Sequence, residues 1–217
     1  SGSIAAIDFG AVIQATDGDG DQIGLGGKFS ITITDDVPAP SIIATGASTT
    51  IDETVNNQSN DTGNQAVRSL FAAVANVGHD ADMGNAAIFA RNGDALVSTF
   101  FSAPGADETT TKVLSLEIAS AGLDSGLATT GGKAIFLFEE GGLIVGRFDS
   151  DGNGTPDTAA FAVAIDQSGR VSVAQYVSLH QGNTATFNET VNLGDKISAV
   201  VTATDYDGDV VRDTVSI

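Results

Sequence analysis

The sequence predicts an all-β protein, an antiparallel β-sandwich of the immunoglobulin-like or Greek-key type with at most one short helix. Apolar residues alternate in short runs bounded by Gly, Asn, Asp and Thr, which is typical of strands separated by turns. The 217 residues, 41% of them hydrophobic, have room for a substantial core. Only six of the 28 acidic residues are Glu, and the remainder are Asp, which favours turns over helix surfaces.

The predicted strands follow one another along the whole chain, and most of them carry Val, Ile or Phe at alternate positions. They cover residues 9–15, 28–34, 41–44, 96–101, 112–119, 133–138, 142–148, 158–165, 171–175, 197–204 and 210–217. Many short strands with turn residues between them favour a sandwich. Turn residues at Glu139–Gly142 and Asp166–Gly169 predict two tight hairpins.

One segment, residues 65–75, predicts a helix, because its apolar residues recur with a helical period. The residues that fall on its apolar face are Val67, Leu70, Phe71 and Val74. This is the one place in the chain where the pattern favours a helix over a strand.

A proline-containing connector at residues 35–40 divides the chain into two parts. Pro38 and Pro40 hold the backbone extended and stiffen it. We therefore expect residues 1–36 to be the last strands of a preceding repeat and residues 37–217 to be the main sandwich domain. Because a two-stranded segment is marginally stable alone, we expect residues 1–36 to pack on a sandwich, in the same chain or in a neighbouring one.

Composition and charge exclude several classes of partner. The formal net charge of −19 disfavours nucleic acid and anionic membrane surfaces, since both would repel the chain. The sequence has no apolar run of eighteen residues, so direct membrane insertion is not expected. There is no cysteine and no visible signal peptide, and we expect the chain to be a piece of a longer protein.

A short acidic motif occurs twice, beginning at Ala15 and at Ala203, 188 residues apart. The first copy reads Ala-Thr-Asp-Gly-Asp-Gly-Asp and the second reads Ala-Thr-Asp-Tyr-Asp-Gly-Asp. An apolar stretch precedes each copy and a β-like stretch follows it. A period of this length indicates tandem repeats, so the expected partners are adjacent repeats of the same polypeptide.

Both copies predict a Ca²⁺ site. The first places Asp17, Asp19 and Asp21 at alternate positions, and the second does the same with Asp205, Asp207 and Asp209. Alternation puts three carboxylates on one side of a strand-end loop, where they would repel one another without a cation. Ca²⁺ prefers such oxygen ligands. The alternative is an exposed hairpin turn with solvated Asp side chains.

A third candidate loop lies between two predicted strands, at residues 149–157. Its spacing matches the beginning of an EF-hand-type loop, including the glycine at Gly154. The candidate ligands are Asp149, Asp151, Asn153, Thr155 and Asp157. The twelfth position is Ala160 in place of the bidentate Glu, so a hairpin tip without metal is the alternative.

A fourth acidic cluster flanks the connector. It combines Asp35 and Asp36 with Asp52 and Glu53. A Ca²⁺ ion that bridges these groups would fix the angle between neighbouring units. A polar linker with ordinary turn acids is the alternative.

Several segments in this order resemble a known family. They are Asp35–Pro38, Gly141–Arg147, Ala160–Asp166, Gly169–His180 and Val191–Asp209. Together they resemble the long tandem repeat of type I-secreted RTX adhesins, which lie on Gram-negative bacterial surfaces and in biofilms. The resemblance is best over residues 9–38 and 114–217.

The resemblance implies an extracellular β-sandwich extender that binds Ca²⁺, repeats many times and holds an adhesive tip away from the cell. It also implies that the chain folds after export, where it meets millimolar Ca²⁺. The ion sites it implies are the two repeated motifs and the cluster around the connector. The loop at residues 149–157 goes beyond the family pattern and rests on its spacing alone.

The expected function is therefore a non-catalytic, Ca²⁺-stabilised spacer. The alternative is a Ca²⁺-dependent module that binds a carbohydrate, although the chain has no Trp and two Tyr to form an aromatic platform. An enzyme is disfavoured. The chain has two histidines, His79 and His180, both expected in loops or strand ends, and Glu139–Glu140 reads better as a turn than as a catalytic carboxylate pair.

Overall fold

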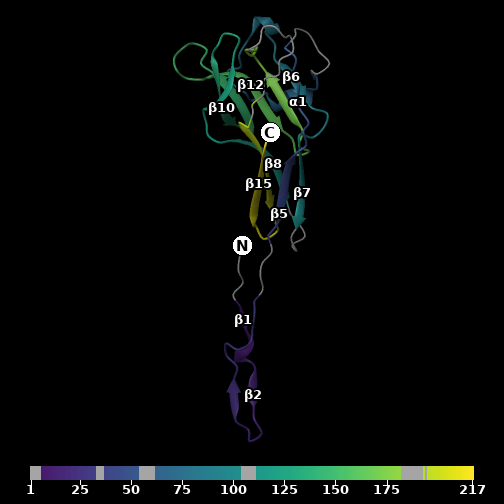
Figure 1. The fold of residues 1–217 in the computed structure, drawn as a ribbon, viewed down its shortest axis with the longest axis vertical. Helices are drawn as coiled ribbons and strands as arrows, with labels where there is room; N and C mark the ends of the chain where they lie inside the picture. Colours follow the sequence, from purple (N-terminus) through teal and green to yellow (C-terminus); the bar gives the residue numbers. More distant parts are fainter. Residues whose placement is uncertain (1–5, 33–36, 54–61, 104–110, 182–192, 194) are drawn as a thin grey trace.

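The computed structural model of the chain describes residues 6–32, 37–53, 62–103, 111–181, 193 and 195–217. The protein is long and narrow, with a β-sandwich body and a thin two-stranded ribbon that projects from one end of it (Figure 1). The ribbon contains residues 6–32, and the body is formed by the rest. The architecture is all-β with antiparallel sheets, as the sequence predicts.

The larger sheet has six strands in the order β6-β13-β12-β11-β10-β9. They are Ile88–Arg91 (β6), Leu123–Ala128 (β9), Ala134–Glu140 (β10), Leu143–Phe148 (β11), Thr158–Ile165 (β12) and Val171–Gln175 (β13). Strands β9 to β13 form a continuous antiparallel meander, and β6 pairs with β13 at the edge. This sheet occupies the upper half of the body in Figure 1.

The two tight turns of this meander lie close to where the sequence places them. The turn at Asp166–Gly169 is confirmed, because the Asp166 N–H donates to the Arg170 carbonyl at 2.9 Å. The turn at Glu139–Gly142 is shorter than predicted. Strand β10 runs through Glu140, and the turn is made by Gly141 and Gly142, with φ of 58° and 84° that suit glycine.

The lower half of the body is formed by two smaller sheets. One has the order β15-β14-β8 and the other pairs β5 with β7. Their bounds are Ala39–Ala44 (β5), Val97–Ala103 (β7), Thr111–Ile118 (β8), Ile197–Thr204 (β14) and Val210–Ser216 (β15). Strand β14 is central and pairs with β8 over eight residues, although the whole meander lies between them in sequence. The Ile42 N–H donates to an Asp213 carboxylate oxygen at 3.0 Å, which joins β5 to β15.

The main core lies between the six-stranded sheet and strands β8 and β14. Leu116 of β8, Leu137 of β10, Ile144 of β11 and Val201 of β14 are all buried in it. A second cluster covers the opposite face of the larger sheet, where Val67 and Phe71 pack against Val145, Ala162, Ala174 and Tyr176. Strands β11 and β12 are therefore buried on both faces, which explains why their sequences are continuously apolar rather than alternating.

The predicted helix is present but shorter than expected. Helix α1 covers Gln65–Leu70, and the Asn64 side chain caps it by accepting a hydrogen bond from the Ala66 N–H. Leu70, predicted on the buried face, is 40% exposed, whereas Phe71 just after the helix is buried as predicted. No helix in the described part of the chain has the length and apolar composition to span a membrane.

The ribbon contains four short strands and one 3₁₀ turn. They are Ile7–Asp8 (β1), Phe9–Ala11 (η1), Gln14–Thr16 (β2), Gln22–Gly24 (β3) and Ser30–Ile31 (β4), with β1 paired to β4 and β2 paired to β3. The strand predicted at residues 9–15 is interrupted by η1. A Cβ added at Gly10 would lie 2.0 Å from the Leu25 carbonyl oxygen, so the chain bends where another strand backbone passes close by.

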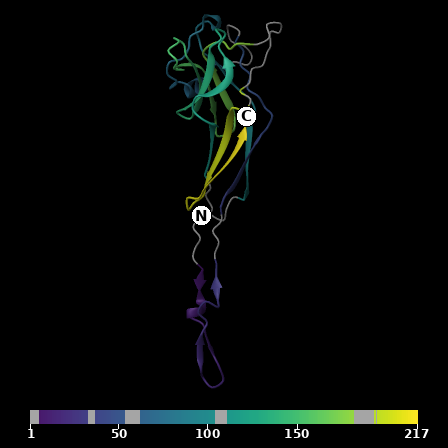
Figure 2. The same cartoon turned by 60° about the vertical axis from the view of Figure 1, so that its left-hand side comes forward.

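The ribbon lies beyond the end of the body rather than against it (Figures 1 and 2). Its apolar side chains are correspondingly open, with Val12 78% and Ile23 67% exposed. That residues 1–36 pack on a sandwich, in the same chain or in a neighbouring one, stays a prediction.

Candidate metal sites

The first acidic motif forms the turn at the tip of the ribbon, between β2 and β3. We call residues 17–21 the ribbon turn. Asp17 accepts hydrogen bonds from the N–H groups of Asp19 at 3.3 Å and Asp21 at 3.0 Å, and its own N–H donates to the Asp21 carbonyl at 3.0 Å. Gly20 has a φ of 100°. An Asp at the first position therefore holds the turn by bonding to the backbone ahead of it.

The second motif forms the turn between β14 and β15, and we call residues 205–209 the body turn. Asp205 accepts from the N–H groups of Gly208 at 3.0 Å and Asp209 at 2.7 Å, and its N–H donates to the Asp209 carbonyl at 3.2 Å. Gly208 has a φ of 99°. The two turns thus have closely similar backbone geometry at equivalent positions, so the repeat seen in the sequence is also a repeat of structure.

Each turn gathers three carboxylates. In Asp17, Asp19 and Asp21, and again in Asp205, Asp207 and Asp209, one carboxylate oxygen per residue lies within 4.8 Å of the others. Among the described acidic residues these are the two such groups. Three negative charges at this separation repel one another, and a divalent cation bound between them would remove the repulsion.

The two turns differ in burial. The ribbon turn is exposed throughout, whereas Asp205 is 8% exposed. A hydrogen bond shared with the Asp19 side chain and one accepted from the Asp21 N–H lower the pKa of Asp17. Burial alone would raise the pKa of Asp205, but a hydrogen bond shared with the Asp207 side chain and bonds from the turn N–H groups outweigh it and lower the pKa. Both first-position carboxylates are therefore held in the ionised form that a cation requires.

The third candidate, the long loop at residues 149–157, connects β11 to β12. Asp149 accepts from the N–H groups of Gly152 and Gly154, both at 2.7 Å, and these bonds lower its pKa. Asp151 accepts from the Asn153 N–H at 3.0 Å, and the Asn153 side chain accepts from the Thr155 N–H at 2.7 Å. The loop that the sequence predicts between two strands is therefore present, and its own side chains hold it through hydrogen bonds to the backbone.

The carboxylates of the long loop are less closely grouped than those of the two turns. Asp149, Asp151 and Asp157 do not form a group of three within the separation given above. The Lys133 ammonium donates to the carbonyls of Asp149, at 2.8 Å, and Ser150, which places a positive charge at the base of the loop. Of the two turns and the long loop, the long loop therefore has the least support as a metal site.

The acidic cluster at the connector is described in part. Asp35 and Asp36 lie outside the described residues. A Glu53 carboxylate oxygen accepts from the Leu179 N–H at 2.9 Å and from the Gln175 side chain, so this residue ties its segment to the end of β13. Burial raises the pKa of Glu53, and the negative charges of Asp80 and Asp52 raise it further.

The raised pKa of Glu53 gives a pH-dependent prediction. Because its folded-state pKa lies above the unfolded value, its contribution to stability is most favourable below the unfolded pKa and is lost as the pH rises through the folded pKa. Glu53→Gln keeps the acceptor oxygen but removes the charge. We expect the variant to melt a few degrees above the parent at pH 7 in Ca²⁺-free buffer, since ~1 kcal/mol moves the melting temperature of such a domain by ~2–4 °C.

The difference between the two proteins should disappear near pH 4, where the carboxylate is protonated in the folded state. Thermal unfolding between pH 4 and pH 8 measures this. Asp94→Asn, which removes an exposed carboxylate elsewhere, is the control. A constant difference at every pH would show that desolvation of Glu53 is not its cause.

The residues considered for catalysis are used in other ways. Glu139 accepts from the Ile118 N–H at 2.9 Å, and Glu140 forms a two-pronged ion pair with Arg147 at 2.6 and 2.7 Å. Both glutamates line a pocket of about 370 Å³ beside Phe138. His79 and His180 are exposed.

Sequence reasoning missed Asp80 and Arg147. Asp80 caps the 3₁₀ turn Ala81–Met83 (η2) and accepts from the Ser178 N–H at 2.8 Å. In this position its negative charge raises the pKa of Glu53. The signal that could have identified Asp80 is its Asp-Ala-Asp spacing, which is typical of a cap. The residues next to Arg147 in the sequence give no signal of its role, because they form an ordinary strand.

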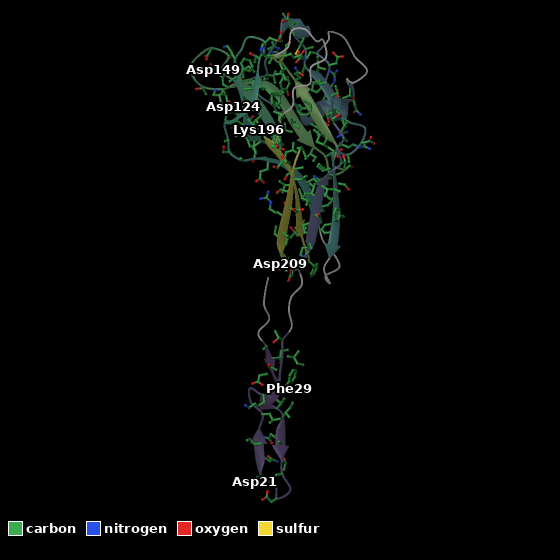
Figure 3. The ribbon with its side chains drawn as sticks, viewed as in Figure 1. Asp21, Phe29, Asp124, Asp149, Lys196 and Asp209 are labelled. Atoms are coloured by element: carbon green, nitrogen blue, oxygen red, sulfur yellow. The ribbon has the colours of Figure 1, made fainter. Side chains whose placement is uncertain are left out.

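The three acidic loops lie at separate places along the molecule. Figure 3 shows Asp21 at the tip of the ribbon, Asp209 at the end of the body from which the ribbon projects, and Asp149 near the opposite end. The body turn therefore lies where the chain enters the body from the ribbon.

A family model for a domain of unknown function, DUF5801, matches residues 48–217. The chain belongs to this family. The DUF5801 match begins after the ribbon and β5, and it includes the long loop, the body turn and every residue of the two core clusters except Ile42. Comparison with curated proteins gives no match, and neither does comparison with solved structures.

Proposed function

We propose that this DUF5801 chain is a non-catalytic, Ca²⁺-stabilised extender module of a large bacterial surface adhesin. It would lie outside the cell, in a tandem array with copies of itself, and project an adhesive tip from the surface. The observation that carries the proposal is the acidic turn that occurs twice, 188 residues apart, with the same backbone geometry and three gathered carboxylates in each copy.

The shape of the molecule supports a spacer. The sandwich and the ribbon follow one another along a single long axis (Figure 2). The ribbon turn and the body turn recur along this axis, each at the end of a two-stranded hairpin. Ca²⁺ bound in such turns would rigidify the hairpin ends. A spacer needs this rigidity to hold the adhesive tip at a distance from the cell.

Charge also supports a cation-dependent fold. A net charge of −19 destabilises a compact state by self-repulsion, and each bound Ca²⁺ removes two negative charges. The pKa values of Asp17, Asp149 and Asp205 are all lowered by hydrogen bonds, so these carboxylates are ionised at neutral pH. They are therefore available as ligands without the loss of a proton on binding.

Thermal unfolding of EDTA-treated protein, with Ca²⁺ or with Mg²⁺, tests the proposal. Binding to the native state alone adds about 1.4 kcal/mol per site at ten times the dissociation constant, by mass action. We expect a Ca²⁺-specific rise of ~3–6 °C per occupied site, given ~2–4 °C per kcal/mol for a chain of this size. An unchanged melting temperature would contradict the proposal.

Single substitutions assign the response to a loop. Asp207→Asn in the body turn should remove part of the Ca²⁺-induced rise and leave the melting temperature in EDTA nearly unchanged, because Asp207 is exposed. Asp151→Asn makes the same change in the long loop, and Asp94→Asn is the matched control outside all three. A full rise in the Asp207 variant would exclude the body turn as a site.

A Ca²⁺-dependent carbohydrate-binding module is the second candidate, and one observation favours it. Tyr206 lies within the body turn, between two candidate Ca²⁺ ligands, and is 80% exposed. An exposed aromatic ring beside a Ca²⁺ ion is a surface on which a sugar ring could stack. A glycan array probed with and without Ca²⁺ tests this function, with Tyr206→Ala as the control protein. Ca²⁺-dependent binding that the variant loses would favour a carbohydrate-binding module over a spacer.

A further inference from the structure

The two copies of the repeated motif have the same sequence pattern but very different surroundings. Counting back 188 residues aligns Val12 and Ile13 of the ribbon with Val200 and Val201 of β14. Val200 and Val201 are fully buried, whereas Val12 is 78% and Ile13 is 38% exposed. Apolar side chains that form part of the core in one copy are thus open to solvent in the other.

The difference comes from what surrounds β14, which packs in the main core through Val201 and has a strand on each side. Strand β14 has β15 on one side and β8 on the other, with Val200 opposite Ser115 and Val201 opposite Leu114. In the ribbon, as far as the structure describes it, β2 pairs with β3 in a sheet of two strands.

Next to the turn, the ribbon pairs as the β14–β15 hairpin does, with Ala15 opposite Ile23 where Ala203 lies opposite Val211. Farther from the turn the pairing is shifted by four residues, since Ser30 lies opposite Asp8 and its counterpart Thr214 lies opposite Val200. The ribbon therefore corresponds to the turn end of the β14–β15 hairpin, without the β8 edge.

Strand β8, which the ribbon lacks, also contributes an ion pair on one face of the β15-β14-β8 sheet. The Arg212 guanidinium on β15 pairs with the Glu117 carboxylate on β8 at 2.5 Å. Arg212 lies opposite Thr202 and Glu117 lies opposite Ser198, so the pair crosses β14 over the position of Val200. The pair therefore lies on the same face of the sheet as Val200, which is fully buried.

The second strand of the ribbon carries a counterpart of this arginine. After the turn, the ribbon has four more residues than β15, and Gly24–Gly27 accounts for them. Beyond this insertion, Lys28, Ser30 and Ile31 align with Arg212, Thr214 and Val215. These three pairs share chemical character, whereas Phe29 between them aligns with Asp213. Lys28 has the charge needed to pair with a Glu117 on a neighbouring strand.

The ribbon and the β14–β15 hairpin also point in the same direction. In Figures 1 and 2 the turn of each hairpin is directed to the same end of the long axis. A second copy of the body, placed so that its closing hairpin is the ribbon, would have the same orientation as the first. Such copies would form a line.

We propose that residues 7–32 are the closing hairpin of a second copy of this fold, in which the segment Phe9–Thr16 lies beside β8 in the position that β14 occupies here. Val12 then lies opposite Ser115 of the second copy, and Lys28 pairs with Glu117 of that copy. The inference names the partner of the ribbon within the tandem array of the proposed function, on which it rests.

A chimera tests this assignment within one chain. Residues 195–217 of the full chain are replaced by residues 7–33, and Val12→Cys in the transplanted segment supplies the one thiol, because the chain has no cysteine. We expect cooperative unfolding and thiol labelling at least about a hundredfold slower than that of Val12→Cys in the original ribbon, since a buried site reacts only when it opens.

The control is the same chimera with Ile13→Asn in the transplanted segment, at the position of the fully buried Val201. It should lose cooperative unfolding. A chimera that folds while its thiol reacts as fast as in the original ribbon would overturn the assignment.

A measurement between two chains covers the case in which the chimera does not fold. Full-length Val12→Cys is mixed with Ser115→Cys truncated after residue 194, and we expect a disulfide-linked heterodimer under mild oxidation. Ile13→Cys, whose side chain faces the opposite side of the strand, should crosslink far less. Equal crosslinking of both variants, or none, together with an unfolded chimera, would also overturn the assignment.

The outcome is separable from that of the Ca²⁺ experiment. If the chimera and the crosslinking fail while the parent chain keeps its Ca²⁺-induced rise in melting temperature, the hairpin assignment is wrong and the Ca²⁺-stabilised module stands. If the hairpin assignment succeeds and Ca²⁺ leaves the melting temperature unchanged, the repeat structure is supported and the Ca²⁺-stabilised module is wrong.

Discussion

Replacing Arg147 with methionine should lower the free energy of unfolding by about 2–4 kcal/mol, somewhat below the cost of breaking a fully buried ion pair because Glu140 is partly exposed. Arg147 is 8% exposed, and besides the Glu140 carboxylate it donates to the carbonyls of Ala75, at 3.2 Å, and Asp157, at 2.5 Å. Methionine fills a similar volume but leaves these acceptors without their donor.

The effect has structural consequences beyond one strand. Through its three acceptors Arg147 connects the segment after α1, the end of the long loop and strand β10. We therefore expect the melting temperature to fall by ~5–15 °C, at ~2–4 °C per kcal/mol. Arg170→Met, which removes an exposed arginine, is the control and should change stability by less than about 0.5 kcal/mol.

The pH dependence of this loss follows from the ion pair. Hydrogen bonds from Arg147 lower the pKa of Glu140, so the stability that the pair supplies is present above the unfolded pKa and is lost as the pH falls through the folded pKa. The gap between parent and variant should narrow in acid. Glu140→Leu in the Arg147→Met background should restore part of the stability, because it removes the unpaired charge. A melting temperature equal to that of the control would contradict this account.

Much of the body could be predicted from local pattern. Strands β8, β12, β13 and β14 begin and end within two residues of the predicted ranges, because their apolar residues and flanking turn residues give clear boundaries. Strands β6 and β9 were missed. Each contains few β-branched residues, and β9 includes Gly126 with a φ of 75°. Neither segment therefore shows the residue pattern of a strand.

The turns could be predicted for the same reason. An Asp at the start of each motif bonds to N–H groups up to four residues ahead, and this geometry depends on the local sequence alone. Glu53 and Arg147 each make contacts across more than seventy residues, which no local pattern encodes. The burial of the two motifs differs because only the second is part of the sandwich body, a long-range contact that the motif itself does not encode.

Gly146→Val should destabilise the body by about 3 kcal/mol, at the upper end of the usual cost of overpacking a core. Gly146 lies in β11 opposite Phe161 of β12, and both residues are buried. A Cβ added there would lie 2.5 Å from two atoms of the Phe161 ring, which itself packs in the main core. The ring cannot move aside without displacing its neighbours, because core side chains are close-packed.

A double-mutant cycle identifies the ring as the cause. If Phe161 occupies the space that the valine needs, Gly146→Val should cost much less in a Phe161→Leu background, with a coupling of about 1–2 kcal/mol. Gly93→Val is the control, since its added Cβ meets no heavy atom within 4 Å. Additive effects would show that the strain lies in the backbone of β11 instead. The Ca²⁺-induced rise should be the same in all of these variants, because the acidic turns and this part of the core contribute to stability independently.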